Sequence, residues 1–245
     1  MTALREVEAV FILADISGYT RFMIANQRAL HHAQVIISEL IRTLLDEVKM
    51  PLKIAEIEGD AVFLYAVKEG NPQAWEKARR TIGWTLENFS EVFYKKLDKL
   101  VMASPCGCGA CHNMEHLKIK VVAHSGKAII NTIDRFLKIS GVDTIIAHRL
   151  LKNTVPSDDY ILVTKSAFED LQFSNAHCFT PHQEKYEDVG TIEAFVCLTR
   201  EGVVSAPKAK PSFAISDIPM YVRASVELLL LKLGLMKPAK LDFNA

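Results

Sequence analysis

Apolar residues are concentrated in a run near the N-terminus, Val10–Ala14, which ends on Asp15 and is followed by a Ser-Gly turn. A run this apolar is typical of a strand that is covered on both faces, so residues 6–15 are predicted to form a buried strand with Asp15 at its tip. The turn leaves the backbone N–H groups of residues 16–20 free at the start of a helix, where they can bind a phosphate. The pattern also fits a core strand whose terminal Asp caps the next helix.

Apolar residues then recur at helical spacing over residues 21–45, and two strand-like runs meet at Asp60, which predicts a hairpin with Asp60 at its turn. Pro72 is suited to the first turn of a second long helix. Further patterns predict strands and helices up to a terminal hairpin around Gly190. The later strands are expected at residues 51–58, 60–67, 117–130, 135–140 and 160–164, with the terminal hairpin at 186–198. One or two helices are expected over 21–45, and further helices at 73–100, 141–152 and 165–171.

Two motifs stand at the predicted strand tip and hairpin: residues 11–20 read FILADISGYT, and residues 58–63 read EGDAVF. Together they resemble the two metal-binding motifs of the class III nucleotidyl cyclases, the adenylate and guanylate cyclases, in a divergent bacterial branch. The HSGK sequence at residues 124–127 is similar to the cyclase strand that reads His-x-Gly. The resemblance implies an α+β fold, a ferredoxin-like βαββαβ core with additional strands, and the order of the predicted elements agrees with it.

Carboxylates on adjacent strand ends can hold two divalent cations, which would polarise a phosphate and activate a hydroxyl nucleophile. Asp15 and Asp60 are the candidates here, with Mg²⁺ or Mn²⁺ as the metal. The resemblance further implies that Ile16 lends its backbone carbonyl to a metal. It also implies that the turn cradles the triphosphate of a nucleotide through Ser17, Gly18, Tyr19 and Thr20. The alternative is that the two acids are unrelated strand ends.

Base recognition in the cyclases uses two positions that correspond to Glu56 and Lys138. A glutamate can accept hydrogen bonds from N1–H and the exocyclic amine of guanine, and a lysine can donate to its O6, so the pair matches guanine and favours GTP over ATP. The expected ligand is therefore a purine nucleoside triphosphate. Glu56 and Lys138 could equally form an ion pair with no ligand.

The cyclase resemblance implies that Arg149 stabilises the transition state. Two departures from the family pattern accompany it: Ile145 stands where the family has an Asn that positions the sugar, and residues 187–190 lack the family's phosphate-binding Lys. An intact metal site therefore does not guarantee turnover. The leading hypothesis is a protein that converts its nucleotide to a 3′,5′-cyclic nucleotide slowly or under regulation. The alternative is a degenerate regulatory module that binds a nucleotide or metabolite without cyclising it.

A cysteine-rich insertion, residues 103–116, lies outside the cyclase pattern. Three thiols and two imidazoles within it can supply soft ligands to a tetrahedral zinc ion. Alternatives are a redox-active thiol pair, thiols without a ligand, or covalent haem attachment through the CxxCH pattern that starts at Cys108. The candidate ligands are Cys106, Cys108, Cys111, His112 and His116.

The amino-acid composition favours some of these hypotheses over others. The 245 residues are 49% hydrophobic, enough for one domain, expected at residues 1–202. Lys plus Arg and Asp plus Glu total 29 each, so no charge excess favours nucleic acid as a partner. The N-terminus lacks the pattern of a signal peptide, so a cytoplasmic location is expected. The five cysteines are therefore interpreted as thiols and metal ligands rather than a disulfide framework.

Residues 203–245 are expected to form a linker and a leucine-rich helical tail, with four consecutive leucines at 228–231. Glu227 and Lys232 interrupt the apolar run well below the roughly 20 residues that a membrane span needs. Docking onto the domain or a partner subunit is favoured over attachment to a membrane surface. The cyclase resemblance implies a homodimer, in which Asp15, Asp60 and Glu56 of one chain face Lys138 and Arg149 of the other.

Overall fold

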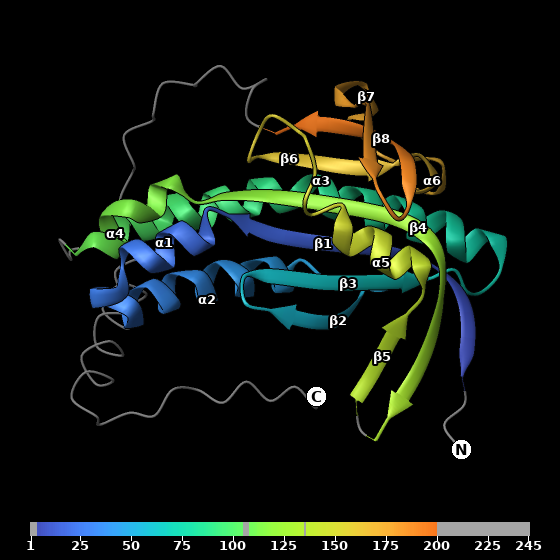
Figure 1. Ribbon diagram of the computed structural model, residues 1–245, viewed down its shortest axis with the longest axis horizontal. Coiled ribbons are helices and arrows are strands. Elements are labelled where there is room, and N and C mark those ends of the chain that lie inside the picture. Colours follow the sequence, from blue (N-terminus) through green and yellow to red (C-terminus); the bar gives the residue numbers. More distant parts are fainter. Residues whose placement is uncertain (1–3, 105–107, 135, 200–245) are drawn as a thin grey trace. The chain divides into compact units, whose positions relative to one another are not determined.

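The fold is built around one long strand, β1 (Arg5–Ser17), in this computed structural model, which describes residues 4–104, 108–134 and 136–199 (Figure 1). The strand lies between β3 and β4 and is antiparallel to both. Its central residues Val10–Leu13 are at most 1% exposed. The predicted strand covered on both faces is confirmed.

The strands form one sheet in the order β2-β3-β1-β4-β6-β8-β7, with β5 paired to the far end of β4. Among the described strands, β4 and β6 are the one parallel pair. Strands β4, β1, β3 and β2 and the helices between them form the ferredoxin-like βαββαβ core, as predicted. The later strands are β2 (Lys53–Glu58), β3 (Ala61–Val67), β4 (Lys118–Ile133), β5 (Phe136–Ser140), β6 (Tyr160–Thr164), β7 (Thr180–Tyr186) and β8 (Gly190–Leu198).

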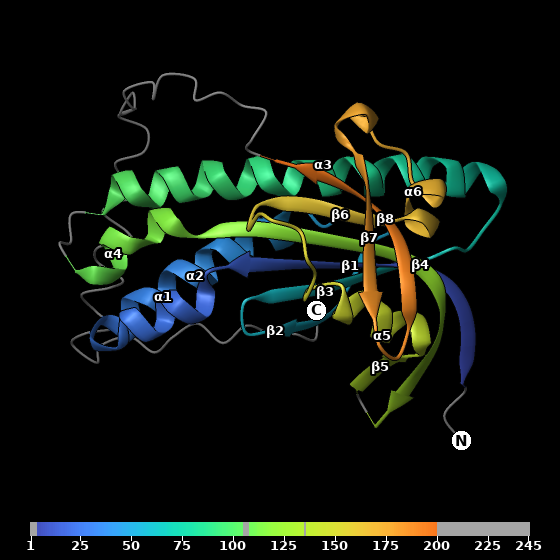
Figure 2. The ribbon, with the colours of Figure 1, turned by 45° about the horizontal axis from the view of Figure 1, so that its top comes forward.

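Helices cover both faces of the sheet. Val10 and Ile12 of β1 belong to a cluster with apolar residues of α2 and α3, whereas Phe11 and Leu13 pack on the face that α5 covers. Figure 2 shows α3 running along the length of the sheet, and the β4–β5 hairpin extending beyond it. The helices are α1 (Tyr19–Ala25), α2 (Leu30–Asp46), α3 (Pro72–Ala103), α4 (Gly109–Asn113), α5 (Val142–Arg149) and α6 (Lys165–Asp170), with 3₁₀ turns η1 (Gln27–Ala29), η2 (Met114–His116) and η3 (Ala176–Cys178).

Most predicted elements are present, with shifted ends. Helix α3 begins at Pro72, and the Asn71 side chain caps it by accepting a hydrogen bond from the backbone N–H of Ala74 at 2.8 Å. The terminal hairpin is longer than predicted, because its first strand begins at Thr180 rather than near Tyr186. The helix expected over residues 141–152 ends at Arg149.

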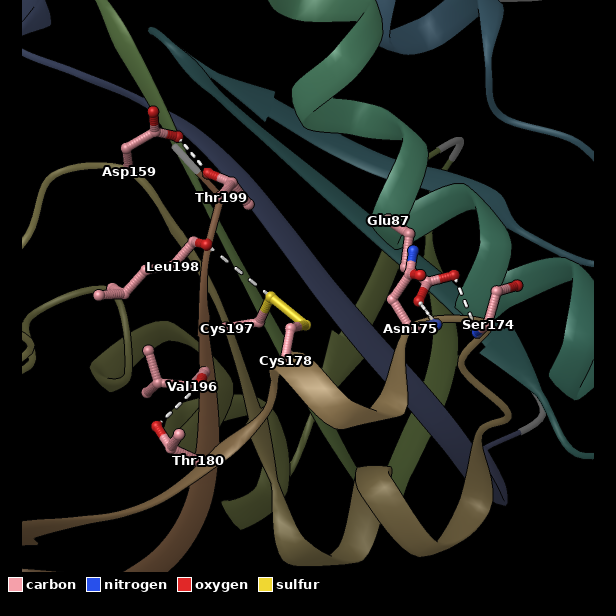
Figure 3. Close-up of a disulfide and its surroundings, with 10 residues drawn as sticks. All are labelled: Glu87, Asp159, Ser174, Asn175, Cys178, Thr180, Val196, Cys197, Leu198 and Thr199. Carbon is pink, nitrogen blue, oxygen red and sulfur yellow. Dashed lines mark hydrogen bonds between the residues drawn. A yellow bond between two sulfur atoms is a disulfide. The ribbon is translucent and has the colours of Figure 1, made fainter. Parts of the chain in front are cut away.

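The interpretation of all five cysteines as thiols is wrong for two of them. Cys178, in η3, and Cys197, on β8, form a disulfide across 19 residues of sequence (Figure 3). In the same region, the carboxylate of Glu87 on α3 accepts hydrogen bonds from the backbone N–H groups of Ser174 and Asn175. These contacts fasten the segment before β7 to α3. The disulfide and the Glu87 hydrogen bonds join residues that are separated in the sequence, so no local pattern predicts them.

The described residues fall within one compact unit, Met1–Val204, and the predicted linker and leucine-rich tail lie outside the described residues. The boundary at residue 202 and the docking of the tail stay predictions. Among the described helices, none combines the length and apolar character that crossing a membrane requires. The cytoplasmic location also stays a prediction.

Candidate functional site

Two carboxylates lie together at one end of the sheet. Asp15 is close to the end of β1, opposite Ala61 of β3, and Asp60 precedes Ala61 in the β2–β3 turn. Burial, the negative charge of Asp15 and a side-chain hydrogen bond with Asp15 raise the pKa of Asp60 to about 7. The two carboxyl groups are therefore neighbours that interact strongly, and their shared role in metal binding stays a prediction.

Lys120 completes this group, and no sequence pattern pointed to it. The register of β1 with β4 sets Lys120 directly opposite Asp15, and its Nζ lies 2.9 Å from Asp15 Oδ2. The side chains of Lys120 and Asp15 are only 22% and 16% exposed. A partly buried cation beside two carboxylates offsets part of their mutual repulsion.

The turn after β1 borders the same space. Gly18 has a φ of 89°, a left-handed conformation that favours glycine, and it is the N-cap of α1 without a side-chain capping bond. Asp15 therefore does not cap this helix. The turn, the two carboxylates and Lys120 line a cavity of about 290 Å³, which we call the acidic cavity. It is lined by Asp15, Ile16, Ser17, Gly18, Tyr19, Thr20, Arg21, Asp60 and Lys120.

The acidic cavity fits a divalent cation and an anionic ligand. Its two carboxylates are hard oxygen ligands of the kind that Mg²⁺ and Mn²⁺ prefer. The hydroxyl of Ser17 is buried and has no hydrogen-bond partner among the described residues. A buried polar group without a partner is costly, so a ligand oxygen at this position would be stabilising.

A second cavity, of about 810 Å³, is formed by β2, β5 and α5, and we call it the wide cavity. Glu56, Lys138, Ile145 and Arg149 all line it. Glu56 and Lys138 are exposed and make no ion pair within the described part of the chain, so the alternative of a mutual ion pair is not realised. Glu56 lines the same cavity as Lys138 and Arg149 of its own chain. How these residues face one another across a dimer stays a prediction.

Arg149 is engaged within the chain. Its Nη2 lies 2.7 Å from Oδ2 of Asp188. Asp188 lies in the β7–β8 turn, where the cyclase pattern has a phosphate-binding lysine. One turn earlier on α5, the side chain of Ile145 is 54% exposed at the cavity. The wide cavity therefore presents an apolar side chain and an arginine that already has an acidic partner.

Residues 124–126, the HSG motif, resemble the cyclase strand that reads His-x-Gly, and they have a structural role that this resemblance does not imply. His124 is buried, and its Nε2 and Nδ1 lie 3.2 Å from Asp143 Oδ1 and 2.9 Å from Thr164 Oγ1. Burial lowers the pKa of His124. Asp143 packs over Gly126 so closely that an added Cβ there would collide with its carboxyl group. The motif thus holds the first turn of α5 against β4, which positions Ile145 and Arg149.

The cysteine-rich insertion brings a different histidine to its thiols. His32, on α2, contacts Cys108 and Cys111, and these three side chains form a group with all donor atoms within 4.8 Å of one another. The predicted ligands His112 and His116 are exposed and are not members of this group. Cys106 lies outside the described residues. The imidazole that contacts the thiols in this structure is that of His32, which nothing local in the sequence marks. Ligation by His112 or His116 stays a prediction.

Comparison with known proteins gives one family and one relative. A family model described as "Protein of unknown function (DUF2652)" matches residues 37–160. An uncharacterised protein of Mycobacterium tuberculosis, Rv2561/Rv2562, is 30% identical over 154 residues, which cover 63% of this chain and 69% of the relative.

Class III cyclase domains are among the solved structures that match this fold. The adenylyl cyclase CyaB from P. aeruginosa matches with a TM-score of 0.56 and 13% identity, over 79% of this chain and 95% of that one. The guanylyl cyclase Cya2 matches with a TM-score of 0.57 and 11% identity, over 82% and 96%. A class III adenylyl cyclase-like ATP-binding protein from Pseudomonas aeruginosa matches with a TM-score of 0.51 and 16% identity, over 69% and 36%. At these identities the likeness establishes the fold alone.

Proposed function

This chain belongs to the DUF2652 family and has the class III nucleotidyl cyclase fold, and we propose that it binds a purine nucleoside triphosphate with two divalent metal ions at the acidic cavity. The observation that carries the proposal is the pairing of Asp15 with Asp60, in which the pKa of Asp60 is raised to about 7. A carboxylate pair that retains a proton near neutral pH has a high electrostatic cost when both acids are ionised, and bound cations would remove that cost.

Asp15, Asp60 and the backbone carbonyl of Ile16 would hold Mg²⁺ or Mn²⁺, which supplies charge neutralisation for the phosphates when bound. The other groups of the cavity suit the phosphates themselves. Ser17 offers a hydroxyl without a partner in the described residues, and Lys120 offers an ammonium group at the same wall. Backbone N–H groups at the start of α1 would bind further phosphate oxygens.

The base would bind in the wide cavity of a second copy. Among the described residues the two cavities of one chain share no lining residue, so a nucleotide that uses both is best accommodated between two chains. Exposed apolar side chains on β2, β4, β5 and α5, next to the wide cavity, support such a homodimer. They are Ile54, Ile129, Ile133, Phe136, Leu137, Val142 and Ile145. Glu56 and Lys138 provide the acceptor and donor that match guanine, which favours GTP over ATP.

Binding is better supported than efficient cyclisation. Ile145 cannot hydrogen-bond a ribose oxygen, and the guanidinium of Arg149 forms a solvent-exposed ion pair with Asp188. One of the P. aeruginosa proteins that share the fold is itself described as cyclase-like and ATP-binding, a precedent for a nucleotide-binding role. Slow cyclisation is the second candidate, favoured by one observation: Arg149 still lines the same cavity as Glu56 and Lys138.

The test is to incubate the full chain with Mn²⁺ and each of ATP, GTP, CTP and UTP, to measure binding by calorimetry and to analyse products by mass spectrometry. We expect the purine nucleotides to bind, GTP more tightly than ATP, with little or no cyclic product. Rapid formation of cyclic nucleotide would replace the binding role with the cyclase role. Failure of all four nucleotides to bind at millimolar concentration would overturn both.

The shared site has its own test. If product forms, mixing inactive Asp60→Asn with inactive Arg149→Ala should restore activity, because one site of the mixed dimer carries neither substitution. No recovery despite measured subunit exchange would mean that each site lies within one chain.

A further inference from the structure

The strongest unassigned feature lies where α2 and the cysteine-rich insertion meet. His32 Nδ1 lies 3.2 Å from Cys108 Sγ and 3.7 Å from Cys111 Sγ. All three side chains are half-buried, and the three donor atoms lie within 4.8 Å of one another. The sulfurs come from α4 and the residue before it, and the nitrogen comes from a helix more than 70 residues earlier in the chain.

These separations match the edges of a tetrahedral zinc site. Zn–S bonds of about 2.3 Å and Zn–N bonds of about 2.0–2.1 Å at a tetrahedral angle place the nitrogen and each sulfur about 3.6 Å apart. The observed distances of 3.2 and 3.7 Å lie on either side of that value. Soft thiolates with an imidazole favour zinc over Mg²⁺ or Mn²⁺, which prefer the oxygen ligands of the acidic cavity.

The core holds the three donors in place independently of any metal. On the insertion, Ala110 and Met114 are fully buried on either side of Cys111, in the same apolar cluster as Ala33 and Ile37 of α2. His32 is adjacent to Ala33, so packing of α4 against α2 presents the imidazole to the thiols. A site arranged in this way loses little conformational entropy when it binds a metal.

We propose that His32, Cys108 and Cys111 bind one zinc ion, which fastens α4 and η2 to α2. Binding replaces the thiol protons: Cys108 and Cys111 each lose one proton and ligate as thiolates, and His32 ligates as a neutral imidazole through Nδ1. These three ligands leave the fourth tetrahedral position to a water molecule, and the metal would stabilise the fold because it links two segments that are distant in sequence.

The fastened segment also contacts the nucleotide-binding turn. An added Cβ at Gly18 would lie 3.7 Å from the backbone carbonyl oxygen of His116, the last residue of η2. The zinc ion would thus stabilise the wall against which this turn packs. The zinc site itself does not depend on nucleotide binding.

The test is to purify the full chain without chelator, count zinc per chain by elemental analysis, and replace it with Co²⁺ for absorption spectroscopy. We expect one zinc per chain and a cobalt spectrum with thiolate charge-transfer and tetrahedral d–d bands. Absence of bound metal, or a cobalt spectrum without thiolate bands, overturns the proposal. A Cys108–Cys111 disulfide in the purified chain, detected by peptide mass spectrometry, would do so too.

Single substitutions identify the histidine. His32→Ala should weaken zinc binding on the order of 100-fold, whereas His31→Ala, its exposed neighbour on α2, should leave the affinity unchanged. His112→Ala and His116→Ala should also retain zinc. If His112→Ala or His116→Ala loses the metal and His32→Ala does not, the assignment is wrong.

His32→Cys separates ligation from folding. This variant keeps a donor at the same position, so it should retain one metal and increase the thiolate charge-transfer intensity of the cobalt protein by about half, from two thiolates to three. Retention of zinc with an unchanged cobalt spectrum would show that residue 32 is not a ligand.

Discussion

The acidic cavity and the wide cavity differ in how their charged groups are paired. In the acidic cavity, Asp15 and Asp60 are forced together and Lys120 offsets only part of their repulsion, so the site retains an electrostatic cost. In the wide cavity, Arg149 has an acidic partner in Asp188, and Glu56 and Lys138 are exposed to solvent. A bound cation would relieve the repulsion that remains between Asp15 and Asp60, although it would share Asp15 with Lys120, whereas a nucleotide that uses Arg149 would meet its ion pair with Asp188.

A cyclase must bind metal and triphosphate, and it must also stabilise the transition state. The two cavities differ in how well they meet these two requirements. Binding metal and triphosphate needs carboxylates and phosphate-binding groups, and under the proposal the acidic cavity would supply both. Stabilising the transition state needs oriented donors and an available cation, and the wide cavity has Ile145 and a paired arginine at those places. The difference therefore favours a protein that binds nucleotide more readily than it cyclises it.

The largest expected effect is on metal-dependent binding. Asp15→Asn or Asp60→Asn should lower the affinity for Mn²⁺ with nucleotide on the order of 100-fold or more, because each removes a direct metal ligand rather than an outer partner. Arg149→Ala in the wide cavity should change it by less than about tenfold. Asp98→Asn, at an exposed aspartate of α3, is the matched control. Equal losses in Asp60→Asn and Arg149→Ala would remove the distinction between the two cavities.

The next largest expected effect is an increase in the rate of cyclic-nucleotide formation. Asp188→Ala should free Arg149, and Ile145→Asn should add a hydrogen-bond donor one turn away on α5. Together they should raise cyclic-nucleotide formation on the order of 100-fold, since the loss of a single oriented donor costs about 10²- to 10³-fold in rate. Mass spectrometry of the products measures this, with nucleotide binding as the control. Unchanged product in a variant that binds normally would mean that the wide cavity does not limit turnover.

The raised pKa of Asp60 predicts how Mn²⁺ binding depends on pH. Below a pKa of about 7 a proton competes with the metal, so the affinity for Mn²⁺ without nucleotide should fall about tenfold for each pH unit below 7 and be constant above it. Electron paramagnetic resonance of free Mn²⁺ measures the affinity between about pH 5.5 and 8.5. An affinity that is independent of pH across this range would contradict the close pairing of the two acids.

The smallest effect is on stability. Because the pKa of Asp60 is raised in the folded protein, the unfolded chain releases this proton near pH 4 and the folded chain only near 7, so stability falls as pH rises through that window. Without metal, Asp60→Asn should therefore be more stable than the wild type at about pH 8. The expected gain is on the order of 1 kcal/mol, about 2–4 °C in Tm, and should vanish near pH 4. A lower Tm at the higher pH would mean that the pair is not repulsive.

The parts of the site that lie in contiguous motifs could be predicted from the sequence. Asp15 stands at a strand tip and Asp60 at a hairpin turn, and both positions follow from local patterns of apolar residues and turns. Lys120 and His32 were missed because their neighbours are set by pairing between distant segments. Lys120 meets Asp15 only through the register of β1 with β4, and His32 meets the thiols only through packing of α4 on α2. The Cys178–Cys197 disulfide has the same origin.

The most direct test is a calorimetric titration of GTP into the wild-type chain at about pH 8, once with Mn²⁺ and once in buffer freed of divalent cations without a chelator, so that a metal bound at the proposed His32, Cys108 and Cys111 site would be retained. We predict saturable binding of one nucleotide per chain with Mn²⁺, and an affinity at least about 100-fold lower without it. Equal binding in the two titrations, or no binding with Mn²⁺ at millimolar GTP, would contradict a metal-dependent nucleotide site at Asp15 and Asp60.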